Sequence, residues 1–172
     1  MLVVTFQNSC KSTKIIKKMK KTNITKSVLA GLFSTVTIGV LTLLTYKTEL
    51  GVFLIASFGS SMVLLFGYPE NSFAQPKNIF FGHLLTSMVG IIFLYLVPLP
   101  IFLLIPLAVG FGVALMILLD VTHPPAGGNP IIVIMGSVSL DYLVNPIIIG
   151  SLIILAFGVI LNRLILKKKY PL

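Results

Sequence analysis

The sequence predicts an all-α fold: a polytopic transmembrane helical bundle with five full spans and one short or broken span after a His-Pro-Pro loop. Of the 172 residues, 56% are hydrophobic and only 10% are charged, and the mean hydropathy is +1.07. A soluble domain carries roughly 25% charged residues, so a soluble fold of this size could not bury so much apolar surface. The apolar residues form uninterrupted runs instead of alternating with polar residues, which favours helices over a β-barrel.

Five apolar runs are each close to the roughly 20 residues that cross a hydrocarbon core of about 30 Å. They are residues 27–46, 51–67, 79–97, 101–119 and 146–166. A sixth run, residues 130–140, is about half as long and would cover roughly 16 Å as a helix. The topology depends on whether this short run completes a crossing.

The distribution of basic residues favours six crossings. With six, 12 of the 13 Lys and Arg lie on one side and only Lys47 on the other, whereas five crossings give 8 against 5. Because basic residues are retained on the cytoplasmic side, we expect a multi-pass protein of the cell membrane with both termini cytoplasmic. The expected organisation is a basic N-terminal tail (residues 1–26), a transmembrane domain (residues 27–166) and a basic C-terminal tail (residues 167–172).

This orientation accounts for the net charge of +9, so the lipid bilayer is the expected partner and nucleic acid is not. The irregular loops at residues 68–78 and 120–129 are expected on the same cytoplasmic side.

Small residues recur at every fourth position in the first and third spans, a pattern that lets transmembrane helices approach closely. They are Gly31, Thr35, Gly39, Gly82, Thr86 and Gly90. Packing within one subunit is the favoured interpretation, and a homo-oligomer interface is the alternative.

The candidate site centres on the loop from Asp120 to Asn129, which contains the sequence His-Pro-Pro-Ala-Gly-Gly. Proline disfavours the α conformation in the residue before it, so the fourth span must end near Asp120. Gly127 and Gly128 permit a close approach of the backbone, and Asn129 is expected to cap the next helix. The amides of residues 126–129 would then face a small anion at a helix N-terminus. The alternative is that the loop only ends one helix and starts the next.

Four further polar residues are candidates for the same site. His83 lies five residues inside the third span, where an ionisable side chain usually faces the bundle interior; an interfacial histidine bonded to a loop carbonyl is the alternative. Gln75 and Lys77 could donate to an anion, although Lys77 alone would serve the charge bias. Asp120 stands at the unfavourable end of a helix dipole, and could accept from loop amides, pair with Lys77 or be solvated.

Four motifs occur in order along the chain. They are Phe58-Gly59-Ser60-Ser61, Ala74-Gln75-Pro76-Lys77-Asn78, Gly82-His83 and His123-Pro124-Pro125-Ala126-Gly127. Together they resemble the HPP family of integral membrane proteins. The resemblance implies a small polytopic protein thought to be a transporter, with nitrite movement across cyanobacterial and chloroplast membranes as the function attached to some members.

The sequence departs from the family at Lys77, where arginine is common, and at Gly128-Asn129, where a small residue and threonine are usual. The family is usually described with four spans, whereas the charges here favour six crossings.

The leading functional hypothesis is a transporter or channel for a small inorganic anion, with nitrite as the candidate and with no enzymatic activity, cofactor or metal. The expected substrate pathway consists of His123, Pro124, Pro125, Ala126, Gly127, Gly128, Asn129, His83, Gln75, Lys77 and Asp120. One rival is a structural or regulatory membrane subunit without its own substrate. The other is a metal-dependent membrane enzyme that uses His83, His123 and Asp120 as ligands.

Overall fold

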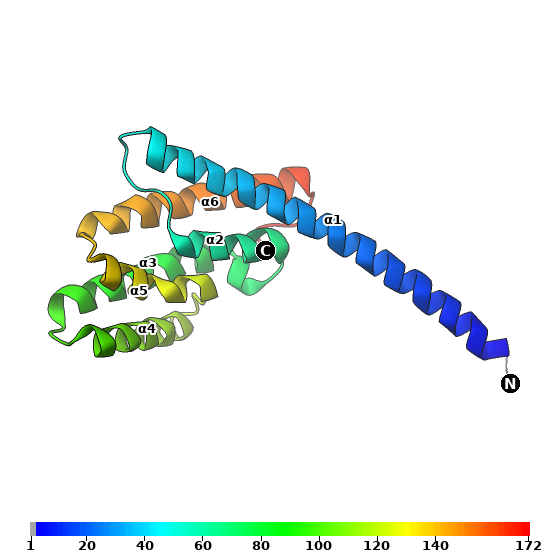
Figure 1. Ribbon diagram of the computed structural model, residues 1–172, viewed down its shortest axis with the longest axis horizontal. Helices are drawn as coiled ribbons and strands as arrows, with labels where there is room; N and C mark the ends of the chain where they lie inside the picture. The colour runs from blue at the N-terminus through cyan, green and yellow to red at the C-terminus, as the bar shows by residue number, and fades with distance from the viewer. Residues whose placement is uncertain (1–2) are drawn as a thin grey trace.

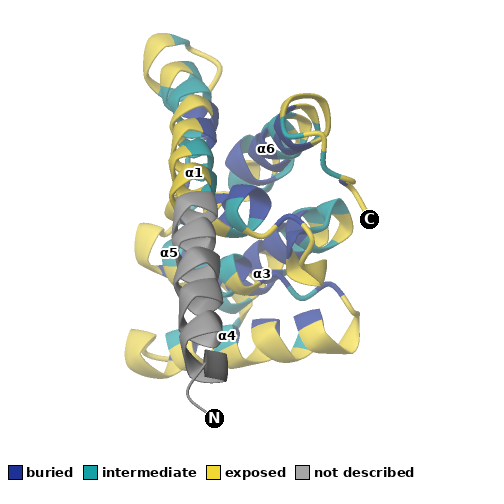
Figure 2. Ribbon diagram, turned by 90° about the vertical axis from the view of Figure 1, so that its right-hand side faces the viewer, coloured by how far each residue is buried: buried dark blue, intermediate teal, exposed yellow. Residues whose placement is uncertain are grey.

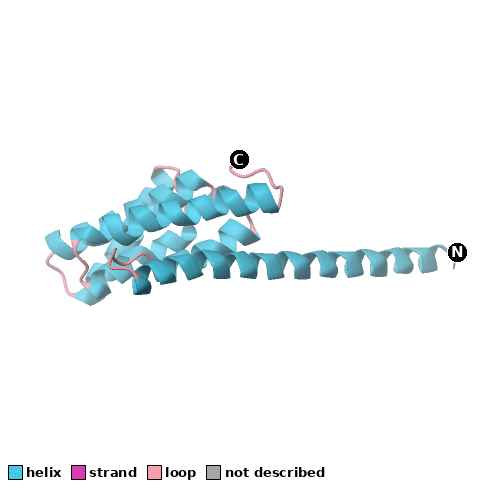
Figure 3. Cartoon of the chain, turned by 90° about the horizontal axis from the view of Figure 1, so that it is seen from above, coloured by secondary structure: helices cyan, strands magenta, loops and turns pink. Residues whose placement is uncertain are grey.

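The computed structural model describes the backbone of residues 3–172 and the side chains of residues 24–172. Within this part every regular element is a helix, as the sequence predicted (Figure 3). Of the predicted N-terminal tail, all side chains before residue 24 lie outside the described residues. The elements are α1 (Val3–Lys47), α2 (Ala56–Met62), η1 (Val63–Gly67), η2 (Ser72–Ala74), α3 (Pro76–Leu96), α4 (Ile101–Leu118), η3 (Pro124–Gly128), α5 (Asn129–Gly136), η4 (Leu140–Leu143), η5 (Val144–Ile148), α6 (Ile149–Val159) and η6 (Ile160–Ile165).

Four helices of the described part are long and apolar enough to cross a membrane. They are Ile24–Lys47 within α1, Pro76–Leu96 (α3), Ile101–Leu118 (α4) and Leu140–Ile165, which joins η4, η5, α6 and η6. They correspond to four of the five predicted full spans. The short run after the His-Pro-Pro loop forms α5, whose eight residues cover about 12 Å.

The second predicted span does not form a full-length helix, so the count of five full spans is not confirmed. Only Ala56–Gly67 is helical, which covers about 18 Å. Residues 51–55 are extended instead. Phe53 and Ile55 are buried while Val52 is exposed, the alternation of an extended segment, and the Phe53 amide donates to Thr45 Oγ1 (3.0 Å). Tertiary packing of these side chains has overridden the run of apolar residues.

Successive helices alternate in direction, so the loops gather at two ends of the bundle (Figure 1). At one end, Tyr170 donates to the Ala74 carbonyl (2.8 Å), and Lys26 lies 3.9 Å from Glu70. This end therefore holds both irregular loops, the C-terminal tail and the start of the first span, which we call the loop end. The shared position of the two loops is confirmed, and its assignment to the cytoplasm stays a prediction.

The opposite end holds the tighter connections. Asn145 donates from Nδ2 to the Leu50 carbonyl (2.9 Å), and the Tyr95 hydroxyl donates to the Val138 carbonyl (3.0 Å). Asn145 precedes Pro146, an order that is common at helix starts, but Asn145 has non-helical φ and ψ angles and its side chain bonds to the connection between α1 and α2 instead.

The central helix is α3, which packs against α4, α5 and the His-Pro-Pro turn. A Cβ added at Gly82 would lie 2.8 Å from His123 Cβ, and one at Gly90 would lie 2.9 Å from Pro130 Cα. The small residues of the third span therefore pack within the subunit, which was the favoured interpretation of the sequence pattern. Gly31 and Gly39 of the first span meet nothing within 4 Å. Figure 2 shows buried residues along α3 and exposed residues along the outer face of α4.

Candidate functional site

Two histidines from distant parts of the chain meet at one serine in the bundle interior. His83, on α3, has its Nε2 atom 3.0 Å from Ser61 Oγ of α2, and His123, in the loop before η3, has its Nε2 atom 2.8 Å from the same oxygen. All three side chains have 0% exposure. The imidazole rings lie 5.0 Å apart, centroid to centroid, at 61°. His83 therefore faces the bundle interior, and its ring bonds side chains instead of the loop carbonyl of the alternative interpretation.

Asn129 closes this arrangement from α5. Its Oδ1 atom accepts from Ser57 Oγ (2.7 Å), while its Nδ2 atom lies 3.1 Å from His83 Nδ1 and 3.2 Å from both the His83 carbonyl and Thr86 Oγ1. The helix α5 has Gly128 at its N-cap position and no side-chain cap. The predicted capping role of Asn129 is thus wrong, because its amide bonds buried side chains instead of its own backbone. We call Ser57, Ser61, His83, Thr86, His123 and Asn129 the polar cluster.

The His-Pro-Pro turn uses its own amides. The Ala126 amide donates to the His123 carbonyl (2.9 Å), and the Asn129 amide donates to the Ala126 carbonyl. Ala126 is buried, Gly127 and Gly128 are half-buried, and Pro124 is exposed with Pro125 half-buried beside it. An anion would therefore find two of the expected donors already engaged, and the turn serves chiefly to position His123 and Asn129.

The irregular loop at residues 68–78, the first of the two loops, supplies the second hydrogen-bond partner of His123. The Phe73 carbonyl lies 2.7 Å from His123 Nδ1. The turn that presents this carbonyl begins at Asn71, whose Oδ1 accepts from the Phe73 amide (2.8 Å). Asn78 then ties the two loops together by donating to the Thr122 carbonyl (2.9 Å). Both ring nitrogens of His123 thus have partners.

Three predicted site residues lie away from the polar cluster. Lys77 Nζ lies 3.2 Å from Asp120 Oδ2, with side chains 56% and 96% exposed. This confirms the pairing alternative for Asp120 and leaves both residues at the surface. Gln75 donates from Nε2 to the Pro69 carbonyl (2.9 Å) and holds the first loop together. The metal set of His83, His123 and Asp120 is not assembled, since the two imidazoles face Ser61 while Asp120 faces Lys77.

Ser57 and Ser61 were missed as site residues. Ser61 belongs to a motif that carried the family resemblance, and both serines lie in a run that is otherwise almost entirely apolar. Their spacing of four residues on one helical face was the available signal. The Ser57 carbonyl is a further acceptor for the Ser61 hydroxyl within this turn, 3.0 Å from its Oγ atom.

The electrostatics of the cluster are those of a neutral site. Burial lowers the pKa of His123 to about 4, and the hydrogen bond to the Phe73 carbonyl opposes part of this shift. His123 is therefore uncharged at neutral pH. The described contacts of the two imidazoles are made by Ser61, Asn129, the Phe73 carbonyl and the Phe58 ring, none of which is charged.

Among the described residues beyond the cluster, the hydroxyls of two fully buried serines have no hydrogen-bond partner, and neither does the buried Tyr142 hydroxyl. Ser87 Oγ lies one helical turn beyond His83 on α3, and Ser151 Oγ lies near the start of α6. Both residues have 0% exposure. Because α3 runs away from the loop end and α6 starts at the opposite end, both serines belong to segments on the side of His83 that leads to the opposite end (Figure 1). An unsatisfied buried hydroxyl costs about 1–3 kcal/mol, so each calls for an explanation.

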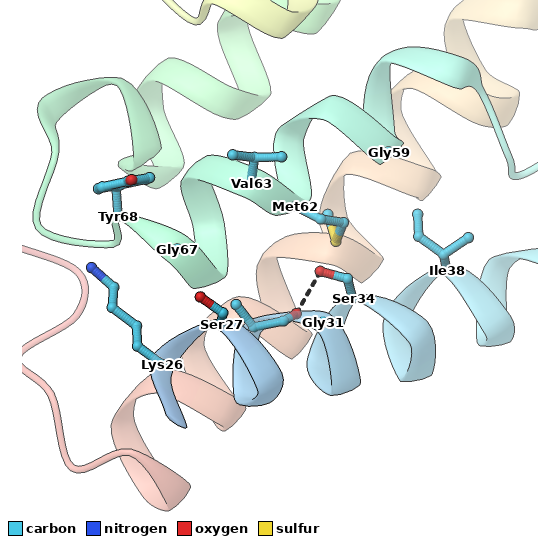
Figure 4. A pocket seen from close by; sticks show the side chains of 11 residues that line it. Lys26, Ser27, Gly31, Ser34, Ile38, Gly59, Met62, Val63, Gly67 and Tyr68 are labelled. Carbon is cyan, nitrogen blue, oxygen red and sulfur yellow. Dashed lines mark hydrogen bonds between the residues drawn. The ribbon is translucent and has the colours of Figure 1, made fainter. Parts of the chain in front are cut away.

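A separate groove of about 690 Å³ runs between α1 and the helix formed by α2 and η1 (Figure 4). Ser34, on its floor, donates to the Ala30 carbonyl (2.7 Å), and Lys26 lies at one end near Tyr68. None of the predicted site residues lines this groove. It is therefore distinct from the polar cluster.

Comparison with known proteins places the chain in a family. Residues 19–171 match the model described as the HPP transmembrane region. Two transmembrane proteins of Dictyostelium discoideum are each 33% identical, over 77% of this chain and over 50% and 46% of their own lengths. The chain thus spans about half the length of these relatives, and no solved structure matches it. Together with four membrane-spanning helices and the His-Pro-Pro turn beside His83, the match leads to one conclusion: this chain belongs to the HPP family of transmembrane proteins.

Proposed function

We propose that the protein moves a small inorganic anion across a membrane, with nitrite as the first candidate, and that the anion passes at the polar cluster. In this proposal the protein is not an enzyme and needs no cofactor, the bilayer is the cell membrane, and the loop end faces the cytoplasm. The charges support that orientation, because Lys26, Lys77, Arg163 and the lysines at 167–169 belong to the loop end or to segments leading to it, while Lys47 lies opposite.

The observation that carries the proposal is the burial of six polar side chains from four segments inside an apolar membrane bundle. Ionisable groups in such a place are costly and mark substrate or ion pathways by default. The helices α2 and α5, which contribute Ser57, Ser61 and Asn129, are also the two short ones. Short or interrupted helices that meet in the interior are typical of transporter binding sites.

The unpartnered hydroxyls of Ser87 and Ser151 extend this reasoning toward the opposite end. A hydroxyl group can donate to an anion that has lost its water, and these two donors are free in the described conformation. The histidines are fully buried in that conformation, so it corresponds to a closed state. Passage requires a second conformation in which the polar cluster reaches water.

The experiment is nitrite uptake into proteoliposomes, with protein-free liposomes as background. We expect uptake by the wild type, and a loss of about tenfold or more when His123→Ala or Asn129→Leu removes a donor, the size expected for about 1.4 kcal/mol or more. Thr35→Ala is the matched control, because Thr35 is exposed on α1 and bonds only the Gly31 carbonyl in the described contacts. Absence of uptake by folded wild type would refute the proposal.

A second candidate, a structural or regulatory subunit, is favoured by one observation. Every side-chain polar atom of the cluster has a hydrogen-bond partner, which is also what a rigid core requires. This candidate predicts that the same variants lower stability while no anion moves in the wild type.

A further inference from the structure

The hydrogen bonds of the polar cluster have a single consistent direction. The Phe73 carbonyl can only accept, so His123 Nδ1 carries a proton and His123 Nε2 is an acceptor. Ser61 Oγ also lies 3.0 Å from the Ser57 carbonyl, but two acceptors 2.8 Å apart need a proton between them, so Ser61 must donate its hydroxyl proton to His123 Nε2. With that proton committed, Ser61 Oγ can only accept from His83 Nε2 (3.0 Å).

Asn129 fixes the other end of the series. Its Nδ2 atom lies 3.2 Å from the His83 carbonyl, an acceptor, which identifies it as the amide nitrogen. The same nitrogen lies 3.1 Å from His83 Nδ1, so that ring nitrogen must be an acceptor and the proton of neutral His83 must be on Nε2. The Phe73 carbonyl and the Asn129 amide thus require the same placement of protons, in which His123 is protonated at Nδ1 and His83 at Nε2.

From this series we propose that one proton accompanies each anion and moves between His83 and His123 through Ser61. The inference rests on the proposed function and adds its coupling ion. The series is suited to transfer because each donor already points at the next acceptor and no rearrangement of heavy atoms is needed between the two imidazoles.

The transfer conserves charge and protons at each step. A proton taken up at His83 Nδ1, once the Asn129 amide has withdrawn, makes His83 an imidazolium. The Nε2 proton of His83 passes to Ser61 Oγ, and the hydroxyl proton of Ser61 passes to His123 Nε2. His83 is then neutral, His123 is the imidazolium, and the Nδ1 proton of His123 leaves at the loop end when its bond to Phe73 opens. After one transfer the two rings have exchanged tautomers, so a proton can then pass the other way by the same steps in reverse, and another transfer in the first direction requires both rings to regain their starting tautomers.

The need for a proton follows from the charges around the cluster. The groups that face the two imidazoles are Ser61 and the Phe58 ring from α2, Asn129 from α5 and the Phe73 carbonyl from the first loop, and none of them is charged. Lys77 and Asp120, the charged pair of the two loops, are exposed and bonded to each other. An anion in this site would have no counter-charge, and an unpaired buried ion costs several kcal/mol. An imidazolium supplies the counter-charge, so anion and proton enter together and the transport is electroneutral.

The test uses proteoliposomes that contain a pH-sensitive dye and receive an inward gradient of sodium nitrite. Nitrite uptake and lumenal pH are recorded together, with the membrane potential set by potassium and valinomycin, and the background of protein-free liposomes is subtracted. We expect one proton per nitrite and a rate that does not change with the imposed potential. Nitrite uptake without acidification, or uptake that follows the potential, would overturn proton coupling and leave the proposed function standing. No uptake by folded wild type would refute both.

Variants at Ser61 separate transfer from packing. Ser61→Ala removes the hydroxyl between the imidazoles and should lower coupled flux by about a hundredfold, the usual size of a lost proton-transfer group. Ser61→Thr keeps the hydroxyl and should retain flux, and Thr35→Ala should match the wild type. Equal proton and nitrite flux in Ser61→Ala and the wild type would overturn the inference.

A measurement that does not depend on transport tests the assigned tautomers of the two histidines directly. The chain has only two histidines, so nitrogen-15 labelling of histidine in membranes gives two pairs of ring-nitrogen signals, provided that the affinity tag contains none. We expect one histidine protonated at Nδ1 and the other at Nε2 near neutral pH. Two histidines in the same tautomer would exclude the directed series.

Discussion

Gly82 tests whether close contact between α3 and the His-Pro-Pro turn holds the polar cluster in place. In Gly82→Ala the added Cβ would lie 2.8 Å from His123 Cβ, 3.1 Å from the Val121 carbonyl oxygen and 3.6 Å from Ala126 Cβ. The first distance is well inside van der Waals contact, and the atoms it meets belong to a buried turn with little freedom to move. Overpacking of this kind costs about 1–3 kcal/mol.

The helix propensity of alanine opposes this cost by about 1 kcal/mol, so we expect Gly82→Ala to lower the free energy of unfolding by about 0–2 kcal/mol, and to be about 1–3 kcal/mol worse than the same change at a site without overpacking. Gly31→Ala is the matched control, because the same change on α1 meets nothing within 4 Å and should be neutral or stabilising by up to about 1 kcal/mol. Unfolding in detergent, followed by circular dichroism with denaturant, measures both variants. If Gly82→Ala were as stable as Gly31→Ala, the close contact described here would not exist.

Three other outcomes follow from the polar cluster and the surface. Burial holds the pKa of His123 at about 4, below its usual 6.5, so the unfolded chain binds a proton at a higher pH than the folded protein does. The free energy of unfolding should therefore be highest above about pH 6.5 and fall by about 3 kcal/mol as the pH approaches 4. Melting temperatures measured across that range would show the decrease. A pH-independent melting temperature would contradict the buried neutral state. Ser57→Ala leaves Asn129 Oδ1 without its partner and should cost about 1–3 kcal/mol by denaturant unfolding. Lys77→Ala removes an exposed pair with Asp120, and a change greater than about 1 kcal/mol would be inconsistent with its solvent exposure.

Much of the architecture follows from local features of the sequence. Long apolar runs identified the four membrane-spanning helices, and the distribution of lysines and arginines placed the two irregular loops together. Pro76 begins α3, and the proline pair before Ala126 keeps α4 from continuing. These features depend on residues close in sequence, so a single chain is enough to reveal them.

The second span could not be predicted in the same way. Residues 51–55 have an apolar composition that suits a helix as well as an extended segment. What selects the extended form is contact with α6: a Cβ at Gly150 would lie 2.9 Å from the Phe53 carbonyl and 2.5 Å from the Phe58 ring. Such a contact joins residues nearly 100 positions apart, which no periodicity encodes.

The contacts within the polar cluster could not be predicted either, because they also join residues that are distant in sequence. His83 and His123 were predicted as pathway residues separately, and their distance in sequence gave no reason to join them through Ser61. Asn129 looked like a helix cap because asparagine before proline is a common start signal. Its role depends on α3 and α2 offering buried partners at the same point, which only the packed structure provides.

The three-residue turn η2 has two of its carbonyl oxygens taken by remote side chains. Phe73 accepts from the His123 ring, 50 positions away, and the adjacent Ala74 accepts from the buried Tyr170 hydroxyl, 96 positions away. Displacement of this turn would strain both bonds at once, so the histidine and the C-terminal tail are mechanically joined through two neighbouring peptide groups. A displacement of the tail would therefore reach the ring of His123 through two hydrogen bonds and one intervening peptide unit.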